Sequence, residues 1–244
     1  VCDMHSRYLL GCDGHKAISL EQTKSCFTRL FHEYGLPQRI RTDNGVPFAS
    51  NAIGRLSTLS VWWIKLGIYP EQIEPGKPQQ NGKHERMHRT LKKEATIPPE
   101  KNLSAQQKRF DAFCDEYNNI RPHEALGMKT PASIYVASKR AMPKKLKHFD
   151  YPCHFEVRLV SKNSGIRWQH EWVKVSTTLE GEYIGFEEID DGIHNVYFCN
   201  VLIGRFFEKQ LKIGDVIGRV PVRHTVVECP DPKLRRKVSP MYLE

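Results

Sequence analysis

Apolar residues recur at helical spacing in four stretches of the first half of the chain. Residues that start helices precede two of these stretches, with capping boxes beginning at Ser19 and Ser104. Glycine or proline follows the stretches where a helix would end, as at Gly35 and Gly67. The expected helices cover residues 20–34, about 52–66, 83–95 and 104–120.

Two short apolar runs predict strands near these helices. Residues 8–10 stand before a glycine and are typical of the end of a strand, and residues 39–42 form a second candidate strand. Asp43 begins an Asp-Asn-Gly turn, so we expect its carboxylate at the C-terminal tip of that strand. Alternation of strands and helices favours an α/β domain, which we place at residues 1–140.

Beyond residue 140 the pattern changes from helical to alternating. Residues 141–152 are basic, contain prolines and lack strong periodicity, which indicates a linker. Short β-rich runs separated by Gly or Asp-Gly turns then predict a small all-β barrel or sandwich over residues 153–213. Residues 214–244 contain several prolines and basic residues and are expected to form an extended tail.

Composition narrows the class of protein. No run approaches the roughly 18 consecutive apolar residues of a membrane span, and the first residues lack the layout of a signal peptide, so we expect a cytoplasmic protein that does not bind a membrane. The seven cysteines are scattered and form no Cys-x-x-Cys pair, which argues against a disulfide framework and a structural zinc site. The chain carries a formal net charge of +9, and basic residues cluster at 77–93, 139–147 and 233–237, as expected for a protein that binds nucleic acid.

Two carboxylates are candidates for metal-dependent chemistry. Asp43 at a strand tip and Glu85 on a helix face can converge, and paired carboxylates near basic side chains hold Mg²⁺ beside a phosphodiester. Either residue alone has a simpler interpretation, because an Asp before Asn-Gly often only makes a turn and a Glu on a basic helix often only forms an ion pair.

Four ordered blocks of sequence are similar to a known family. These blocks are DMHSRY (3–8), RTDNGVPF (41–48), PGKPQQNGKHER (75–86), and YN (117–118) with RPHEALG (121–127). In this order they resemble the integrase-core transposases of bacterial insertion sequences. The resemblance runs from residue 1 to about residue 135, and the β-rich part resembles the small C-terminal barrel of the same enzymes.

The resemblance implies a fold and a metal site. The fold would be an α/β ribonuclease-H-like core, a mixed sheet flanked by helices, followed by a small all-β SH3-like barrel. An Asp-Asp-Glu triad would bind two Mg²⁺ or Mn²⁺ ions, with Asp43 as the second acid and Glu85 as the third. The first acid lies upstream of the block that contains Asp3. We therefore expect an N-terminally truncated chain without that acid and without the usual helix-turn-helix segment, which leaves its activity on its own open.

The implied function is cleavage and strand transfer of DNA during transposition, as in DNA integration and recombination. Partners would be double-stranded DNA, both the element ends and the target, and further copies of the chain in a bacterial, nucleoid-associated assembly. Two alternatives stay open: a catalytically incomplete DNA-binding remnant, and a ribonuclease-H-type hydrolase of RNA–DNA hybrids. The expected DNA contacts come from residues Lys77, Asn81, Lys83, Arg86, Arg89 and Lys92.

Overall fold

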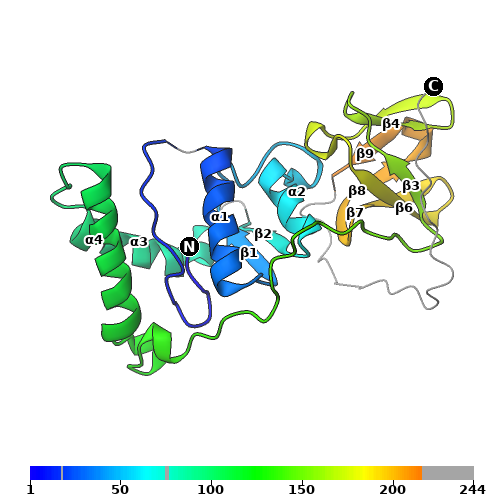
Figure 1. The fold of residues 1–244 in the computed structure, drawn as a ribbon. Helices are drawn as coiled ribbons and strands as arrows, with labels where there is room; N and C mark the ends of the chain where they lie inside the picture. The colour runs from blue at the N-terminus through cyan, green and yellow to red at the C-terminus, as the bar shows by residue number, and fades with distance from the viewer. Residues whose placement is uncertain (18, 75–76, 216–244) are drawn as a thin grey trace. The chain divides into compact units, whose positions relative to one another are not determined.

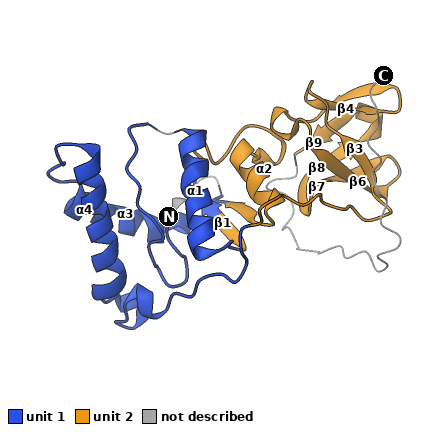
Figure 2. Ribbon diagram, viewed as in Figure 1, with its two compact units in different colours: residues 1–37, 41–43, 72–142 blue, residues 38–40, 44–71, 143–244 orange. Residues whose placement is uncertain are grey.

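The computed structural model describes residues 1–17, 19–74 and 77–215, so most of the predicted tail lies outside the described residues. The chain forms two compact units (Figure 2). The first unit contains residues 1–37, 41–43 and 72–142, and the second contains residues 38–40, 44–71 and the chain from 143 onward. Residues 44–71 thus belong with the β-rich unit although they precede the predicted linker.

Helix α1 spans Leu20–Tyr34 in the first unit and confirms the first predicted helix (Figure 1). The Ser19 hydroxyl accepts a hydrogen bond of 3.1 Å from the Gln22 amide, as the capping box requires. The helix ends at Gly35, which has a φ of 78°. A Cβ at that position would lie 2.4 Å from the carbonyl oxygen of Ser138, so both the backbone conformation and the close approach favour glycine.

Helices α3, Gly82–Ala95, and α4, Leu103–Asp115, pack against each other in the first unit. The buried face of α3 follows the predicted stripe, which confirms the helix between residues 83 and 95. Helix α4 begins before the predicted Ser104 box, because the Asn102 side chain caps it by accepting a 2.8 Å bond from the Ala105 amide. The shared core consists of Leu9, Met87, Leu91, Ala95, Phe113 and Tyr117.

The predicted strand at residues 8–10 is replaced by a tight hairpin. Only an isolated bridge joins Cys2 to Leu9 there, flanked by the bonds Asp3 N to Tyr8 O and Leu10 N to Val1 O. The buried Asn118 side chain takes the place of a neighbouring strand, accepting from Leu9 N at 2.8 Å and donating to Leu9 O at 3.0 Å. One side-chain amide thereby satisfies both polar groups of a backbone residue.

The helix expected over residues 52–66 is shorter than predicted. A 3₁₀ turn at Ile53–Arg55 precedes helix α2, which spans Thr58–Lys65. Gly54 in the turn has a φ of 66°, a value that breaks a right-handed helix, and the Ser57 hydroxyl starts α2 by capping the Ser60 amide.

Strands β1, Arg39–Thr42, and β2, Tyr69–Gln72, form a two-stranded sheet, which confirms the strand before Asp43. The β-rich runs of the second unit also form strands as predicted. In that unit β3, β6, β7, β8 and β9 make a five-stranded antiparallel sheet in this order, and β4 pairs with β5. These strands are β3 Glu156–Leu159, β4 Gly165–Trp168, β5 Glu171–Lys174, β6 Tyr183–Asp190, β7 Ile193–Phe198, β8 Val201–Phe207 and β9 Lys212–Gly214.

The remaining helical turns are short. A π-helical turn at Glu116–Ile120 extends α4 up to the residue before Arg121. The 3₁₀ turns are Pro78–Asn81, Glu124–Leu126, Pro131–Ser133, Thr177–Leu179 and Glu208–Gln210.

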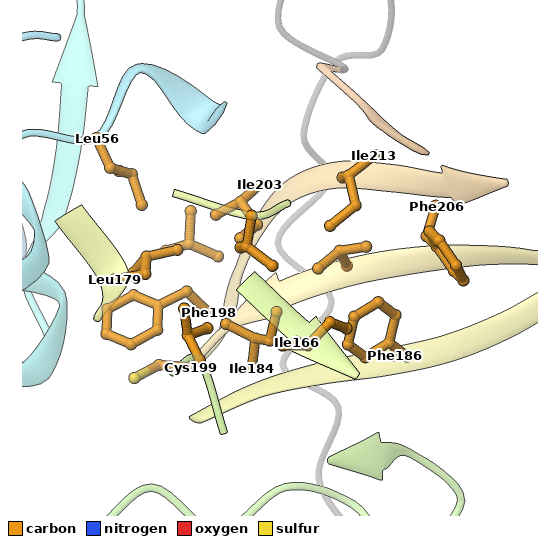
Figure 3. Close-up of a cluster of buried hydrophobic side chains, with 14 of the residues drawn as sticks. Leu56, Ile166, Leu179, Ile184, Phe186, Phe198, Cys199, Ile203, Phe206 and Ile213 are labelled. Carbon is orange, nitrogen blue, oxygen red and sulfur yellow. The ribbon is translucent and has the colours of Figure 1, made fainter. Parts of the chain in front are cut away.

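One apolar cluster holds the second unit together (Figure 3). The side chains of Phe186, Phe198 and Phe206 are almost completely buried in it. Leu56, Val61 and Ile64, from the segment before the predicted linker, are buried in the same cluster. The architecture is therefore mixed α/β, with the antiparallel sheet confined to the second unit.

None of the helices in the described part of the chain is long and apolar enough to cross a membrane.

Candidate active site

Asp43 follows directly after the last residue of β1, as the sequence predicts. Its side chain is exposed, and it lies in the first unit together with residues 72–142. A carboxylate at the end of a short strand is held in place by the backbone pairing of that strand, here with β2.

A hydrogen bond connects the end of β1 to the segment before α3. Arg41 Nη1 donates to the Gln80 carbonyl oxygen at 3.2 Å. The Gln80 side-chain amide in turn bonds to Glu74, with 2.9 Å from the Glu74 backbone N–H to Oε1 and 3.0 Å from Nε2 to the Glu74 carboxylate. These bonds fix the short 3₁₀ turn that leads into α3, so the strand tip and the start of α3 lie close together.

Glu85 lies in the first turn of α3 and is exposed. His84, the residue before it, interacts electrostatically with both Glu85 and Asp43. Burial lowers the pKa of His84, as do the chain's N-terminal ammonium group and His88, while the two carboxylates oppose this shift. His84 therefore lies within electrostatic range of both carboxylates.

The carboxylates of Asp43 and Glu85 have the chemistry that a hard divalent cation requires of its ligands. Asp43 and Glu85 both offer carboxylate oxygens, the preferred ligands of Mg²⁺ and Mn²⁺. Within residues 1–17, 19–74 and 77–215, however, no group of three or more His, Cys, Asp or Glu side chains is arranged to hold a metal ion. Among the described residues, Asp43 and Glu85 therefore stay candidate ligands.

Asp3 has a structural role in the hairpin at residues 1–10. Its Oδ2 accepts hydrogen bonds from the Ser6 amide at 2.7 Å and from the Ser6 hydroxyl at 2.6 Å. This carboxylate is engaged in capping a local turn.

The predicted DNA-contacting residues differ in their surroundings. Lys77 forms an ion pair of 2.5 Å with Glu74, and Lys83 donates to the Met4 carbonyl oxygen at 3.3 Å. Asn81 occupies the N-cap position of α3, but its side chain makes no capping hydrogen bond. The exposed cations further along α3 form no ion pair among the described residues; these are Arg86, Arg89 and Lys92. We call these three residues the α3 basic face.

Sequence patterns missed the residues that organise the site. Arg41 and His84 both lie within the blocks of family resemblance, yet their spacing gives no sign of the contacts they make. The Arg41 bond joins residues 39 positions apart, so no local periodicity reports it. The only signal available was their place beside Asp43 and Glu85.

Comparison with known proteins gives a consistent assignment. Residues 66–131 match the integrase core domain family, a segment that contains Glu85 and the α3 basic face but not Asp43. An uncharacterized 39.2 kDa protein of insertion element IS476 from Xanthomonas euvesicatoria is 32% identical over 127 residues, which cover 51% of this chain and 33% of that protein. The transposase InsD of insertion element IS2 from Escherichia coli is 29% identical over 92 residues, covering 37% of this chain and 28% of that protein.

Among solved structures, the simian T-cell lymphotropic virus intasome in complex with PP2A regulatory subunit B56 gamma aligns with a TM-score of 0.41 and 15% identity. The alignment covers 77% of this chain and 65% of that chain, and a likeness this weak does not define the fold. This chain spans about a third of the length of the two curated relatives named above. Over these stretches the chain is similar to insertion-element transposases of the integrase-core superfamily.

Proposed function

We propose that this chain provides catalytic-core residues for the metal-dependent cleavage and strand transfer of DNA in transposition. The observation that supports the proposal is the Arg41–Gln80 bond, which joins the end of β1, where Asp43 follows, to the segment before α3, where Glu85 lies in the first turn. In this proposal the first unit belongs to a ribonuclease-H-like core, and the second unit contains an SH3-like barrel. The working assembly would contain several copies of the protein on double-stranded DNA, in the bacterial cytoplasm and at the nucleoid.

Asp43 and Glu85 would hold divalent ions through their carboxylate oxygens, with two ions expected in the complete site. Such ions activate water or a 3′-hydroxyl and stabilise the leaving oxygen in phosphoryl transfer. The protein's own contribution is to hold the two carboxylates at fixed positions, on a strand end and in the first turn of a helix. The Arg41 guanidinium helps by keeping the segment before α3 against the end of β1.

The α3 basic face would bind DNA phosphates without reading sequence, because Lys and Arg side chains contact the backbone and position the duplex. Glu85 and the basic face share one helix, so phosphates bound along α3 would lie beside the metal ligands. Lys77, Asn81 and Lys83 lie at the start of this helix and would extend the contact there, once Lys77 and Lys83 exchange their present partners for phosphates.

Metal binding tests the acidic site directly. Titration of the protein with Mn²⁺, followed by electron paramagnetic resonance of the free ion, should show binding that Asp43→Asn and Glu85→Gln each weaken about tenfold or more. Two matched controls should bind as the unchanged protein does. Glu21→Gln removes an exposed carboxylate from the first turn of α1, and Asp190→Asn removes one from the end of β6. Equal effects of site and control variants would refute the proposed ligands.

DNA binding tests the basic face separately. Fluorescence anisotropy with a labelled duplex at several salt concentrations should give a slope of log K against log salt that falls by about 1 for each phosphate contact removed. Lys92→Ala should reduce the slope, whereas Lys108→Ala, an exposed lysine on α4, should leave it unchanged.

A second candidate function, DNA binding without catalysis, is favoured by the lack of a third metal ligand among the described residues. Salt-dependent DNA binding through the basic face, together with no Mn²⁺ binding that depends on Asp43 or Glu85, would establish this candidate in place of the first.

A further inference from the structure

One tryptophan of the second unit is exposed on the hairpin that β4 and β5 form. Trp172 on β5 is 48% exposed, whereas Trp168 on β4 is 4% exposed and belongs to the apolar cluster. Successive side chains of a strand point to opposite faces. Trp168 and Val173 therefore lie on the core side of the hairpin, and the cross-strand pair of Arg167 and Trp172 lies on the solvent side. The Trp172 indole is thus outside the apolar cluster that the described residues form.

The exposed indole is held in place by the strand next to it. A Cβ on Gly165 would lie 2.6 Å from Cζ2 and 2.7 Å from Cε2 of Trp172, so the ring lies directly against the backbone of β4. A glycine in a strand leaves room for such a close approach. Because the ring is already held there, a partner that binds its exposed part pays less to order it.

Two cations flank Trp172 on the solvent side of the hairpin. Arg167 is paired directly with Trp172, and Lys174 lies two positions further along β5, opposite Gly165. Both side chains are exposed, and neither forms an ion pair with another residue in the described part of the chain. The only carboxylate within the hairpin sequence, Glu171, alternates onto the other side. The solvent side therefore combines an aromatic ring with uncompensated positive charge.

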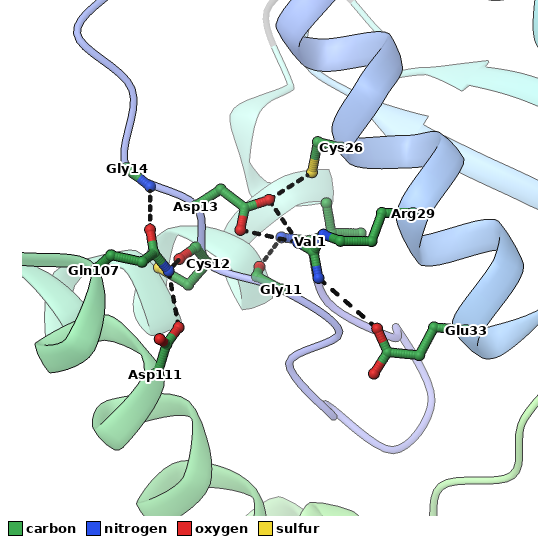
Figure 4. A network of polar contacts seen from close by, with 10 residues as sticks. All are labelled: Val1, Gly11, Cys12, Asp13, Gly14, Cys26, Arg29, Glu33, Gln107 and Asp111. Carbon is green, nitrogen blue, oxygen red and sulfur yellow. Dashed lines mark hydrogen bonds and ion pairs between the residues drawn. The ribbon is translucent and has the colours of Figure 1, made fainter. Parts of the chain in front are cut away.

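Arg29 on α1 shows the contrasting case of an exposed arginine that a carboxylate of the protein binds (Figure 4). Its Nη2 donates to both oxygens of Asp13, at 2.9 and 2.7 Å, and its Nη1 lies 3.8 Å from the Glu33 carboxylate. The Arg29 side chain is 51% exposed, so exposure alone does not leave a cation available to a ligand. Arg167 and Lys174 have no such partner among the described residues, and their charges are complementary to a polyanion.

We propose that Trp172, Arg167 and Lys174 form a binding site for unpaired bases of single-stranded DNA. An indole stacks on a base whose π-face is open, whereas the bases of a duplex cover one another. The two cations would bind the phosphates beside the stacked base. An aromatic ring with neighbouring cations is the composition of sites that bind single strands without reading sequence. The choice of DNA rests on the proposed function, and the stacking itself does not.

Three probes of equal length and label separate stacking from charge. These are a thymidine strand of about 12 nucleotides, the same backbone built from abasic residues, and a duplex. In fluorescence anisotropy with the full chain, Trp172→Ala should weaken binding of the thymidine strand about fivefold to a hundredfold. Binding of the abasic strand and of the duplex should change less than about twofold, because both lack an open base face. Trp172→Phe should restore part of the loss, since phenylalanine keeps an aromatic ring.

Matched controls test whether the effect belongs to this site. Leu159→Ala removes an apolar side chain of similar exposure, 49%, from β3 and should leave all three affinities unchanged. Arg167→Gln should reduce the slope of log K against log salt for the thymidine strand by about 0.7, the value for one phosphate contact on a single strand. Arg29→Gln removes the charge of an arginine that is already bound by Asp13 and should leave the slope unchanged.

Two results would overturn the proposal. One is an equal effect of Trp172→Ala on the thymidine strand, the abasic strand and the duplex, which would show that the surface binds the backbone. The other is unchanged binding of the thymidine strand in Trp172→Ala. Duplex binding that depends on the α3 basic face could persist in both cases, so failure of this site is distinguishable from failure of the proposed function.

Discussion

Replacing Asn118 tests the interpretation that a side-chain amide substitutes for a neighbouring strand. Asn118 is 4% exposed, and its two bonds to Leu9, of 2.8 and 3.0 Å, satisfy both polar groups of that backbone residue. In Asn118→Ala those groups lose their partners. An unsatisfied buried donor or acceptor costs about 1–3 kcal/mol, so two of them should lower the free energy of unfolding by about 2–4 kcal/mol even with partial hydration.

The neighbouring residue provides a matched control. Asn119 is exposed and donates to Asp115 Oδ1 at 2.7 Å, an i,i+4 contact worth about 0.2–0.5 kcal/mol. Urea unfolding followed by circular dichroism at 222 nm should distinguish the variants, because α1, α3 and α4 all belong to the first unit. Hydrogen exchange at the Leu9 amide should also accelerate in Asn118→Ala. If the free energies of unfolding of Asn118→Ala and Asn119→Ala differ by less than about 0.5 kcal/mol, the Asn118 amide does not stabilise the hairpin as we infer.

Four further changes have defined outcomes. Gly165→Ala places a Cβ 2.6 Å from a carbonyl oxygen of the paired strand β5 and should destabilise the second unit by about 1–3 kcal/mol in urea unfolding. Gly82→Ala, where a Cβ meets nothing within 4 Å and φ is −58°, should instead be neutral or add up to about 1 kcal/mol. Arg121→Lys replaces a bidentate pair with Glu94, at 2.6 and 3.1 Å, and should cost about 1 kcal/mol or less in the same assay. Burial, together with nearby arginines, holds the pKa of His123 below its ordinary value of 6.5. The unfolded chain therefore binds the proton more readily, and the free energy of unfolding should fall as the pH drops below about 6.5. The urea midpoints measured at pH 7.5 and pH 5.5 should differ less in His123→Gln than in the unchanged protein.

The sequence predicted helices well where residues close along the chain determine their boundaries. Helix α1 begins at Ser19 because its hydroxyl caps its own first turn, and α3 buries the stripe that its periodicity shows. The errors concern the starts of two other helices, where a different nearby residue determines the first turn. Asn102 caps α4 two residues before the Ser104 box, and the left-handed Gly54 prevents a helix from starting at residue 52.

The sequence predicted on which elements the two candidate acidic residues lie, but not the contacts that support those elements. Asp43 and Glu85 occupy the strand end and helix turn that the sequence indicates. The bonds that organise the first unit join residues far apart, 39 positions for Arg41 and Gln80 and 109 for Asn118 and Leu9. Contacts over such separations leave no periodic trace in the chain. The prediction of a strand at residues 8–10 was wrong for this reason, because the backbone of Leu9 forms its hydrogen bonds with the distant Asn118 side chain and not with a neighbouring strand.

The interleaving of the two units limits how the protein can be divided. A chain shortened at residue 142 would retain residues 44–71 without the β-sheet whose apolar cluster contains Leu56, Val61 and Ile64. These side chains would then face water, a surface that promotes self-association. The segment left uncovered is also the one that joins Asp43 to the β2–α3 region, so such a fragment would be a poor sample for metal or DNA binding.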